Sequence, residues 1–578
     1  MDKKLSVKNL KDALKNFKTE KDINKIQKDK ILTLRKKRIK KNNARRVLEE
    51  NEEKSGQKYK IYEFEEIDFP NIKSGTEIFN IPFEKIFKNN PYENDDIKYW
   101  LHLTYKLSMK GPKEEILKNL SKEKIKFLID LLTEPFQINY TNDNNSIEFS
   151  QIKNDIKVKY EICSILINLL YDTNQYNGLF IEKMMSIYNF IITLIQIYEN
   201  LKDFSFLVLI THYQWIINNC IAEDEVYSLI IKKNSNINFP ELINKIFNIN
   251  HEELYLNNIR MLILYLEQQS NPEIFFQYNI FIPNIDNIIS LSVQNNNIRL
   301  LLNAYNALNI LLKSGANCLL VIENKQYVKL VTKIIYGFNN VSFCNCCLTK
   351  LIKNDKDNII NDTYQIYKTL LDIIFKKISA DKDVIKHALK ILRLIINNKN
   401  GFKIISYIIS TYTKEIFIQL QQLYFEKPCN LLIESEVFNF LLTIFDFSTN
   451  SFKSTLINSG IHIFTLNCLE GSYQEFISDN KDNSSYNKLF AQMLKLLIAI
   501  LKFGQNDLNM KISLKNSCEE KNIYHILLEL NYCKNKKIQD LIEELNTNFF
   551  EGYENEEYED NEYNENNDEI IYIELIII

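Results

Sequence analysis

Apolar residues recur at helical spacing from about residue 97 to residue 550, and loops rich in Asn, Asp and Ser separate the apolar segments. Recurrence near every 3.6 residues predicts α-helices. One unit keeps returning, a nearly continuous apolar helix followed by a polar loop and a shorter apolar helix. The long helices of this unit are expected at 161–170, 213–222, 256–266, 302–312, 387–396, 437–445 and 493–502, with a weaker copy at 346–352.

The returning helices follow one another at similar intervals. Aligning the copies places equivalent positions at 168, 219, 265, 310, 350, 393, 442 and 499, so that successive units begin 40 to 57 residues apart. Armadillo and HEAT repeats have about 40–47 residues, and insertions into them fall in loops. Because one such unit cannot bury its apolar helix alone, the units are expected to stack around a continuous core. An unrelated all-helical bundle is the alternative.

Composition and motifs argue against an enzyme. The 578 residues include only 11 Gly and 9 Pro, whereas phosphate-binding loops need glycines at fixed places. No HExxH, GxSxG or GxxxxGK[ST] motif occurs, and the six His are dispersed. The ten Cys form no CxxC pair, and nothing beside Cys344, Cys346 and Cys347 completes a zinc-binding spacing. We therefore expect no catalytic residues, no cofactor and no metal, and free thiols in a reducing compartment.

The sequence favours a soluble protein. It begins without an apolar signal segment, and no uninterrupted apolar run approaches the roughly 20 residues of a membrane span. The apolar stretch 570–578 is short and contains Glu574. No membrane partner is expected.

The net charge of −3 hides two opposite charged ends. Residues 1–48 carry 18 Lys and Arg against 5 Asp and Glu, whereas residues 551–569 carry 10 Asp and Glu and no Lys or Arg. Blocks of this kind are usually solvated tails that interact with other molecules.

One motif in the repeats points to a ligand. Residues 215–224 read Trp-Ile-Ile-Asn-Asn-Cys-Ile-Ala-Glu-Asp, and Trp215 and Asn219 share a helix face because they are four residues apart. The motif resembles the repeat motif of the importin alpha family of nuclear import adaptors. The resemblance implies that Asn219 holds the main chain of a bound signal peptide, Trp215 stacks on a lysine stem, and Glu223 pairs with its ammonium group. A core tryptophan followed by a capping Asn is the alternative.

Other repeats keep the motif only in part. One repeat earlier, Asn168 is retained and Ser164 replaces the tryptophan; one repeat later, Met261 and Tyr265 occupy the two positions. At the second, minor site of the family the aligned pairs are Leu389 with Arg393 and Phe438 with Leu442. Because an arginine there would repel a basic ligand, we expect one signal-peptide site only, formed by Asn168, Trp215, Asn219 and Glu223.

The basic N-terminal arm resembles the importin-beta-binding segment of the same family. An early Phe17-Lys18 pair precedes Asp22 and two basic clusters. The residues implied to contact importin beta are Leu34, Arg35, Lys36, Lys37, Arg38, Arg45 and Arg46. The alternative is a generic basic arm that binds nucleic acid or acts as a localisation signal, although the arm lacks interleaved aromatic residues for base stacking.

The C-terminal end of the repeats matches the family as well. An Asn522-Ile523-Tyr524 start, two short apolar segments and a Phe549-Phe550 pair precede the acidic residues, as in the last repeat of importin alpha. The resemblance implies an all-α, right-handed superhelical solenoid of about nine or ten armadillo repeats at 97–550. An arm at 1–60, a linker at 61–96 and an acidic tail at 551–578 would complete the chain.

The function implied by the resemblance is nuclear import. The partners would be importin beta, cargo proteins with basic localisation signals, and an exportin-type recycling receptor with Ran-GTP. The protein would shuttle between cytoplasm and nucleus without binding nucleic acid directly. An armadillo scaffold that has lost signal-peptide binding is the alternative.

Overall fold

The structure is a computed structural model that describes residues 121–136, 149–172, 177–222, 224–269, 271–338, 342–375, 382–412, 416–418, 420, 431–479, 484–531 and 535–550. Every regular element in these ranges is a helix, and none of the described residues lies in a strand. The expected all-α class is therefore confirmed. The predicted arm at 1–60, the linker at 61–96, the first part of the repeat region and the acidic tail at 551–578 lie outside the described residues.

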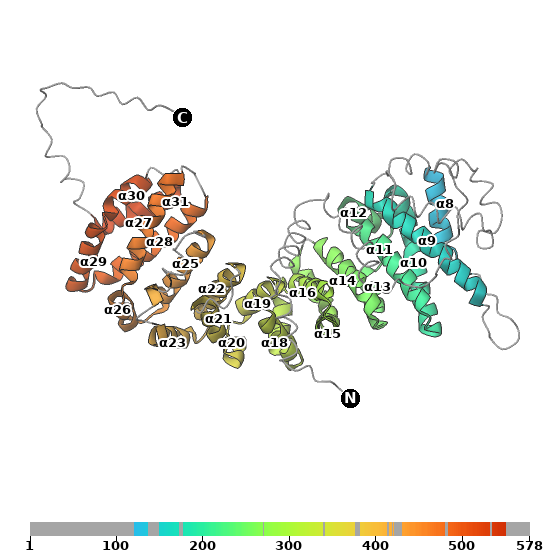
Figure 1. Cartoon of the computed structure of the whole chain (residues 1–578), viewed down its shortest axis with the longest axis horizontal. Coiled ribbons are helices and arrows are strands. Elements are labelled where there is room, and N and C mark those ends of the chain that lie inside the picture. Colours follow the sequence, from blue (N-terminus) through green and yellow to red (C-terminus); the bar gives the residue numbers. More distant parts are fainter. Residues whose placement is uncertain are drawn as a thin grey trace, which may run out of the picture. The chain divides into compact units, whose positions relative to one another are not determined.

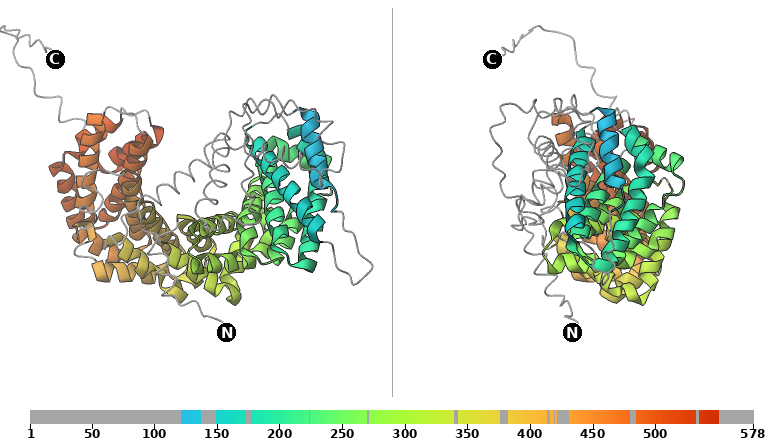
Figure 2. Two further views of the ribbon diagram at one scale, coloured as in Figure 1. Left: turned by 45° about the vertical axis from the view of Figure 1, so that its right-hand side comes forward. Right: turned by 90° about the vertical axis from the view of Figure 1, so that its right-hand side faces the viewer.

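The helices form two compact units, which meet in the sequence between Asn354 and Asp355. In the first unit, five helices pack each against the next in chain order (Figure 1). We call them the first helix row: α9 (Phe149–Asp172), α11 (Phe204–Ile221), α14 (Glu252–Glu267), α16 (Ile298–Leu311) and α19 (Ser342–Asn354). The same sequential order, from teal to green, is visible in the left view of Figure 2.

The remaining helices of the first unit flank this row. Each packs on one or more row helices or on a neighbouring flanking helix. They are α8 (Lys122–Thr133), α10 (Asn177–Leu201), α12 (Asp224–Lys233), α13 (Phe239–Asn248), η1 (Pro272–Phe281), α15 (Ile282–Gln294), α17 (Gly315–Glu323), η2 (Lys325–Tyr327) and α18 (Val328–Gly337).

The second unit repeats the arrangement. Its row, the second helix row, consists of α22 (Lys382–Asn397), α25 (Leu431–Phe447), α28 (Ser484–Gly504) and α31 (Lys536–Phe549), again packed in chain order. The flanking helices are α20 (Ile359–Tyr364), α21 (Ile366–Phe375), α23 (Gly401–Tyr412), α26 (Asn450–Asn458), α27 (Ile461–Asp479), α29 (Leu508–Glu520) and α30 (Ile523–Asn531).

The positions aligned from the sequence alone all fall on row helices. Residues 168, 219, 265, 310 and 350 lie on α9, α11, α14, α16 and α19, and residues 393, 442 and 499 lie on α22, α25 and α28. The interval of 40 to 57 residues therefore measures the distance from one row helix to the next. The row helices inside each row, α11, α14, α16, α25 and α28, are covered by row neighbours on both sides, as stacked repeats require.

Asparagine defines many of the helix ends. Asn250, Asn296, Asn400 and Asn522 adopt positive φ angles of 50° to 66° within two residues of a helix end. Asn tolerates this left-handed conformation better than most residues because its short amide side chain bonds locally. Asn297 also caps α16 by accepting a hydrogen bond from the backbone N–H of Leu300. The Asn-rich loops are thus the stop and start signals of the repeat helices.

A buried lysine closes the N-terminal end of the described core. Lys159 of α9 is 0% exposed, and its Nζ donates to the backbone carbonyls of Leu131 at 2.7 Å and Glu134 at 2.8 Å, at the end of α8. The ammonium also lies 4.7 Å from the ring centre of Phe190. A cation at a helix C-terminus satisfies carbonyls that have no intrahelical partner. Burial lowers the pKa of Lys159 to about 8.

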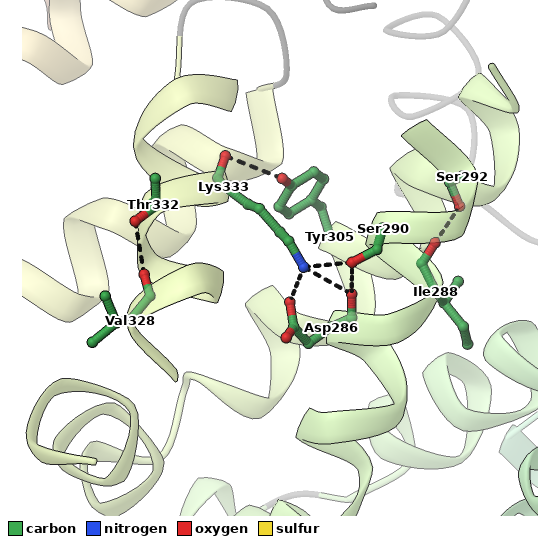
Figure 3. A network of polar contacts seen from close by, with 8 residues as sticks. All are labelled: Asp286, Ile288, Ser290, Ser292, Tyr305, Val328, Thr332 and Lys333. Carbon is green, nitrogen blue, oxygen red and sulfur yellow. Dashed lines mark hydrogen bonds and ion pairs between the residues drawn. The ribbon is translucent and has the colours of Figure 1, made fainter. Parts of the chain in front are cut away.

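A second lysine joins two flanking helices of the first unit. Lys333 of α18 donates to the carboxylate of Asp286 and, at 2.6 Å, to the hydroxyl of Ser290, both on α15 (Figure 3). The Tyr305 hydroxyl of α16 donates to the backbone carbonyl of Lys333 at 3.2 Å. This network fixes α15, α16 and α18 to one another, and we assign it a structural role.

The described cysteines are free and almost all buried. Of the eight cysteines in the described ranges, all are free thiols and only Cys346 is not buried. Among the described residues no cluster of His, Cys, Asp and Glu is placed to hold a metal ion.

The helix α10 is long and apolar enough to cross a membrane, although half of its most apolar window is buried in the protein. Polar residues interrupt its sequence, so it contains no uninterrupted apolar run of that length.

Candidate functional site

The least buried stripe of α11 is the best candidate for a binding surface. The helix begins after Asp203, whose carboxylate accepts the backbone N–H of Ser205 at 2.8 Å. Most of the helix is buried because α9 and α14 pack against opposite sides of it. Its less buried positions recur every three or four residues and form a single stripe. They are Phe204, Ser205, Val208, Thr211, Asn219 and Ala222, and Trp215 has the spacing of this stripe but is itself buried.

Trp215 lies on this stripe but is almost covered. Only 6% of its surface is exposed, whereas Thr211 and Asn219, one turn away on either side, are partly exposed. The structure therefore places the indole at the predicted helix face, with little open ring surface on which a lysine stem could stack. The stacking role stays a prediction.

Asn219 carries the feature that most directly suggests a ligand. Its Nδ2 is buried and has no hydrogen-bond acceptor among the residues that the structure describes. A buried donor without an acceptor is unfavourable by about 1–3 kcal/mol. A main-chain carbonyl of a bound peptide would supply the acceptor, which is the role that the sequence predicts for this side chain.

Asn218, next to Asn219 in the sequence, joins α11 to α14. Asn218 is buried, and its Nδ2 donates to the backbone carbonyl of Asn257 on α14 at 3.0 Å. In return, Asn257 donates to the carbonyl of Thr211 at 3.3 Å, and Gln214 donates to Asn258 at 3.3 Å. These amides join α11 to α14. The Asn218 amide nitrogen thus joins two repeats, whereas the buried Nδ2 of Asn219 has no acceptor among the described residues. The buried Oδ1 of Asn218 likewise has no donor among them.

The other two predicted site residues are not placed. Asn168 lies on α9, but its side chain is outside the described residues, and Glu223 falls in the undescribed position between α11 and α12. The Ser164 hydroxyl, at the position aligned with Trp215, donates to the backbone carbonyl of Tyr160 at 3.0 Å and is buried. The structure brings Trp215 and Asn219 together and leaves Asn168 and Glu223 as predictions.

The next repeat differs from the alignment by one residue. Met261 and Tyr265 are buried, at 0% and 9% exposure, and the Tyr265 hydroxyl bonds to that of Tyr278 in η1 at 2.8 Å. The residues on the partly exposed stripe of α14 are instead Leu256, Arg260 and Leu264. The alignment matched apolar residues with apolar residues and thereby selected the core face of α14.

With Arg260 on the partly exposed stripe of α14, positive charge lies beside the α11 stripe. Burial, and then the charge of Arg299 on α16, lower the pKa of Arg260 from its ordinary value, but a guanidinium remains charged at neutral pH. Further along the row, Lys350 of α19 donates to the side-chain and backbone oxygens of Asn309 on α16. A basic peptide on α11 would meet like charge if it continued toward α14 and α16.

The second helix row carries an ion-paired arginine at the predicted minor site. Leu389 and Phe438 are fully buried, so the aligned tryptophan positions belong to the core. Arg393 of α22 donates from Nη1 to the Glu436 carboxylate of α25 at 2.8 Å, and Lys488 of α28 lies 3.7 Å from the same carboxylate. This arrangement is compatible with the expectation that the minor signal-peptide site is missing here. The ion pair of Arg393 was not expected from the sequence.

Sequence reasoning missed Arg260, Arg299 and Glu436. Helical spacing alone could have found Arg260, because it recurs with Leu256 and Leu264 on one face and breaks the apolar pattern of α14. No sequence signal links Arg393 with Glu436, which are 43 residues apart. The described surfaces offer hydrogen bonds, ion pairs and apolar contact, and no arrangement of nucleophile, base and orienting group was found on them.

Comparisons with known proteins support the fold alone. No model of a protein family matches the sequence, and no curated protein matches it. Among solved structures, the chain resembles an engineered protein with 13% identity and a TM-score of 0.52, over 82% of this chain and 98% of that one. It also resembles a chain from a structure concerned with the phosphorylation-controlled interaction between cadherin and beta-catenin, with 11% identity and a TM-score of 0.50, over 89% of this chain and 97% of that one. The chain is therefore similar to an armadillo-like helical-repeat protein over most of its length.

Proposed function

We propose that the protein is an armadillo-type adaptor that binds an extended polypeptide along its first helix row and acts in nuclear import. In this proposal the repeats form a right-handed superhelix, and the stripe of α11 receives a basic localisation signal. The arm at residues 1–60 links the complex to importin beta, and an exportin-type receptor with Ran-GTP returns the adaptor to the cytoplasm.

The unsatisfied amide of Asn219 is the observation that supports peptide binding. Extended peptides present one main-chain carbonyl every residue, and an asparagine side chain donates to one such carbonyl without regard to the ligand's side chains. Trp215, on the same stripe and one turn away, would provide apolar contact at the edge of its ring. The basic arm supports the import role, because a peptide-binding repeat array alone does not specify one.

The test exploits the two adjacent asparagines. Binding of a fluorescent lysine-rich signal peptide to the full chain is measured by anisotropy, together with the midpoint of urea unfolding. Asn219→Ala removes an unsatisfied donor, so we expect unchanged or slightly raised stability and roughly tenfold weaker peptide binding. Asn218→Ala is the matched control: it should lower stability by about 1 kcal/mol and leave the peptide affinity of the folded protein unchanged.

Trp215 is a poorer test residue. Because the indole is almost completely buried, Trp215→Ala leaves a cavity and should destabilise the protein by about 3 kcal/mol whether or not the ring contacts a ligand. Peptide binding that is identical in the wild type and in Asn219→Ala, with the fold intact in both, would overturn the α11 site.

A protein-interaction scaffold without signal-peptide binding is the second candidate. The observation that favours it is the charge of the neighbouring repeats, where Arg260 and Arg299 follow the α11 stripe. The same anisotropy assay with an acidic peptide of equal length separates the two functions. Binding of the acidic peptide in preference to the lysine-rich one, together with no capture of importin beta by the full chain, would establish the scaffold and exclude the import adaptor.

A further inference from the structure

The exposed face of the second helix row is rich in basic residues. Intervals of three, four and seven residues place further bases on the face of α22 that holds Arg393 and on the face of α28 that holds Lys488. We call the whole set the basic face: Lys382, Lys386, Lys390 and Arg393 on α22, and Lys488, Lys495 and Lys502 on α28. The acids on the same side of this row include Asp383, Glu436, Asp446, Asp540 and Glu544.

Two ion pairs show that the three helices present these residues on one side. Glu436 of α25 lies between Arg393 and Lys488, at 2.8 Å and 3.7 Å, and so connects the stripe of α22 with the stripe of α28. Lys502, two turns beyond Lys495, pairs with Glu544 of α31 at 2.5 Å. The bases of α22 and α28 therefore lie on one side of the second helix row, with Glu436 between them and Glu544 beside Lys502.

Part of this charge is not neutralised. Lys386, Lys390 and Lys495 make no ion pair or hydrogen bond with any residue that the structure describes, and Lys390 is exposed to solvent. Glu436 is shared between two cations. A surface with more bases than acids produces a positive potential that attracts an acidic polypeptide and repels a basic one.

An acidic polypeptide leaves the described structure beside this face. The backbone carbonyl of Asn548, near the end of α31, accepts a hydrogen bond from Gln505 at 3.2 Å, directly after α28. The chain after Phe550 therefore starts at the Lys502 end of the basic face. Its next 19 residues, 551–569, contain ten Asp and Glu and no Lys or Arg.

The spacing of the acids matches the spacing of the lysines. Lys502, Lys495 and Lys488 are seven residues apart, which corresponds to about 10 Å along a helix. Glu551, Glu554, Glu557 and Asp560 are three residues apart, which corresponds to about 10 Å along an extended chain. Crossing from α28 to α22 adds about 20 Å, because packed helices are 8–10 Å apart, and 19 extended residues reach about 60 Å.

From these relationships we infer that the acidic C-terminal segment 551–569 binds back onto the basic face of α22, α25 and α28. The segment runs from Lys502 toward Lys488 and then across Glu436 toward Lys390. Because it is tethered at Phe550, its effective concentration at this face is on the order of millimolar, which exceeds that of most free competitors.

Zero-length crosslinking of the full chain tests the inference. A carbodiimide joins a carboxylate to a lysine amine only when the two are in contact, and mass spectrometry of the monomer band identifies the pairs. We expect Glu554, Glu557 and Asp560 to be linked to Lys502, Lys495, Lys488 and Lys390. These links should decrease in 1 M salt, since exposed charge pairs are screened.

A charge-reversal variant makes the result specific. In the double variant Lys390→Glu and Lys495→Glu, links from the tail to the unchanged Lys488 and Lys502 should fall by about fivefold, because two repulsive charges enter the face. The matched control is Lys403→Glu with Lys511→Glu, at exposed positions on α23 and α29 outside the basic face, and it should leave those links unchanged. Circular dichroism checks that both variants keep their helices.

Three outcomes would overturn the inference. Tail carboxylates linked mainly to lysines of residues 1–48 would show that the two charged ends pair with each other. Links to Lys403 and Lys511 at the same yield as to Lys488 would show a tail without a preferred surface. Unchanged links to Lys488 and Lys502 in the charge-reversal variant would show that the basic face does not hold the tail.

Discussion

Arg393 and Glu436 form an ion pair between adjacent row helices, with Nη1 of Arg393 at 2.8 Å from Oε2 of Glu436. The arginine side chain is 29% exposed and the carboxylate is buried, so both charges are partly removed from water. A charge at this position was expected from the sequence to act on a ligand. The Arg393 charge instead pairs with Glu436 of the next repeat. The positive charge that remains on this surface comes from the neighbouring lysines.

We expect a measurable coupling energy between these two residues. In a double-mutant cycle with Arg393→Met and Glu436→Gln, the coupling in the free energy of unfolding should be about 1 kcal/mol, since the pair is hydrogen-bonded and partly buried. The exposed pair Lys399–Asp357, with side chains 68% and 67% exposed, is the control and should show almost no coupling. Equal coupling in both cycles would contradict the assignment of Arg393 and Glu436 as a repeat–repeat contact.

The repeats were predictable from the sequence because their signal is redundant. Most row helices are rich in apolar residues, and eight copies recur at similar intervals, so an error in one copy does not change the architecture. Asparagine at helix ends, as at Asn296 and Asn400, also marks boundaries by a local conformational preference. Local patterns of this kind can be recognised in the sequence without knowledge of the tertiary contacts.

The register within a helix was not predictable to one residue. Arg260 and Met261 are neighbours in the sequence, yet one lies on the partly exposed stripe of α14 and the other is fully buried. One residue rotates the side chain by about 100° around a helix, so an alignment shifted by one position exchanges core and surface. On α11, Asn219 is partly exposed, whereas Trp215, one turn earlier, is buried. Pairings such as Arg393 with Glu436 depend on side-chain conformations, which no sequence pattern encodes.

The buried His212 should make stability depend on pH. Burial lowers its pKa to about 4, although the Nδ1 hydrogen bond to the carbonyl of Val208, at 2.8 Å, acts in the opposite direction. The unfolded chain takes up the proton near pH 6.5, before the folded protein does. The free energy of unfolding should therefore fall between pH 6.5 and pH 4, by up to about 3 kcal/mol from this group.

Urea unfolding at pH 7.5, 6, 5 and 4.5 measures this effect. His212→Gln should flatten the profile over that range, because the substituted side chain does not titrate. His525→Gln, at an exposed position of α30, should keep the wild-type profile. Identical profiles for His212→Gln and the wild type would assign the acid sensitivity to other groups.

Lys159 should stabilise the end of α8. Replacing it with methionine keeps the apolar stem but removes the donors to the carbonyls of Leu131 and Glu134, and buried acceptors without a partner are unfavourable. We expect Lys159→Met to lower the free energy of unfolding by about 2 kcal/mol. Lys126→Met, on the exposed side of the same helix, should change it by less than about 0.5 kcal/mol. A stabilised Lys159→Met protein would show that removing a buried charge outweighs the lost hydrogen bonds.

Removal of the basic arm should strengthen peptide binding at the α11 stripe. Residues 1–48 carry an excess of 13 positive charges on the same chain as the proposed signal-peptide site, so the arm competes with a basic peptide as a tethered ligand. A short flexible tether gives an effective concentration on the order of millimolar, and competition at that concentration weakens the apparent affinity by tenfold or more when the arm binds in the high-micromolar range. Anisotropy titrations of the lysine-rich peptide compare the full chain with a chain that begins at residue 49. Adding a synthetic peptide of residues 1–48 to the shortened protein should restore the weaker affinity, whereas a scrambled peptide of equal charge controls for nonspecific attraction. Equal affinities of the full and shortened chains would show that the arm does not occupy the stripe, and its proposed contact with importin beta would then have to be tested separately.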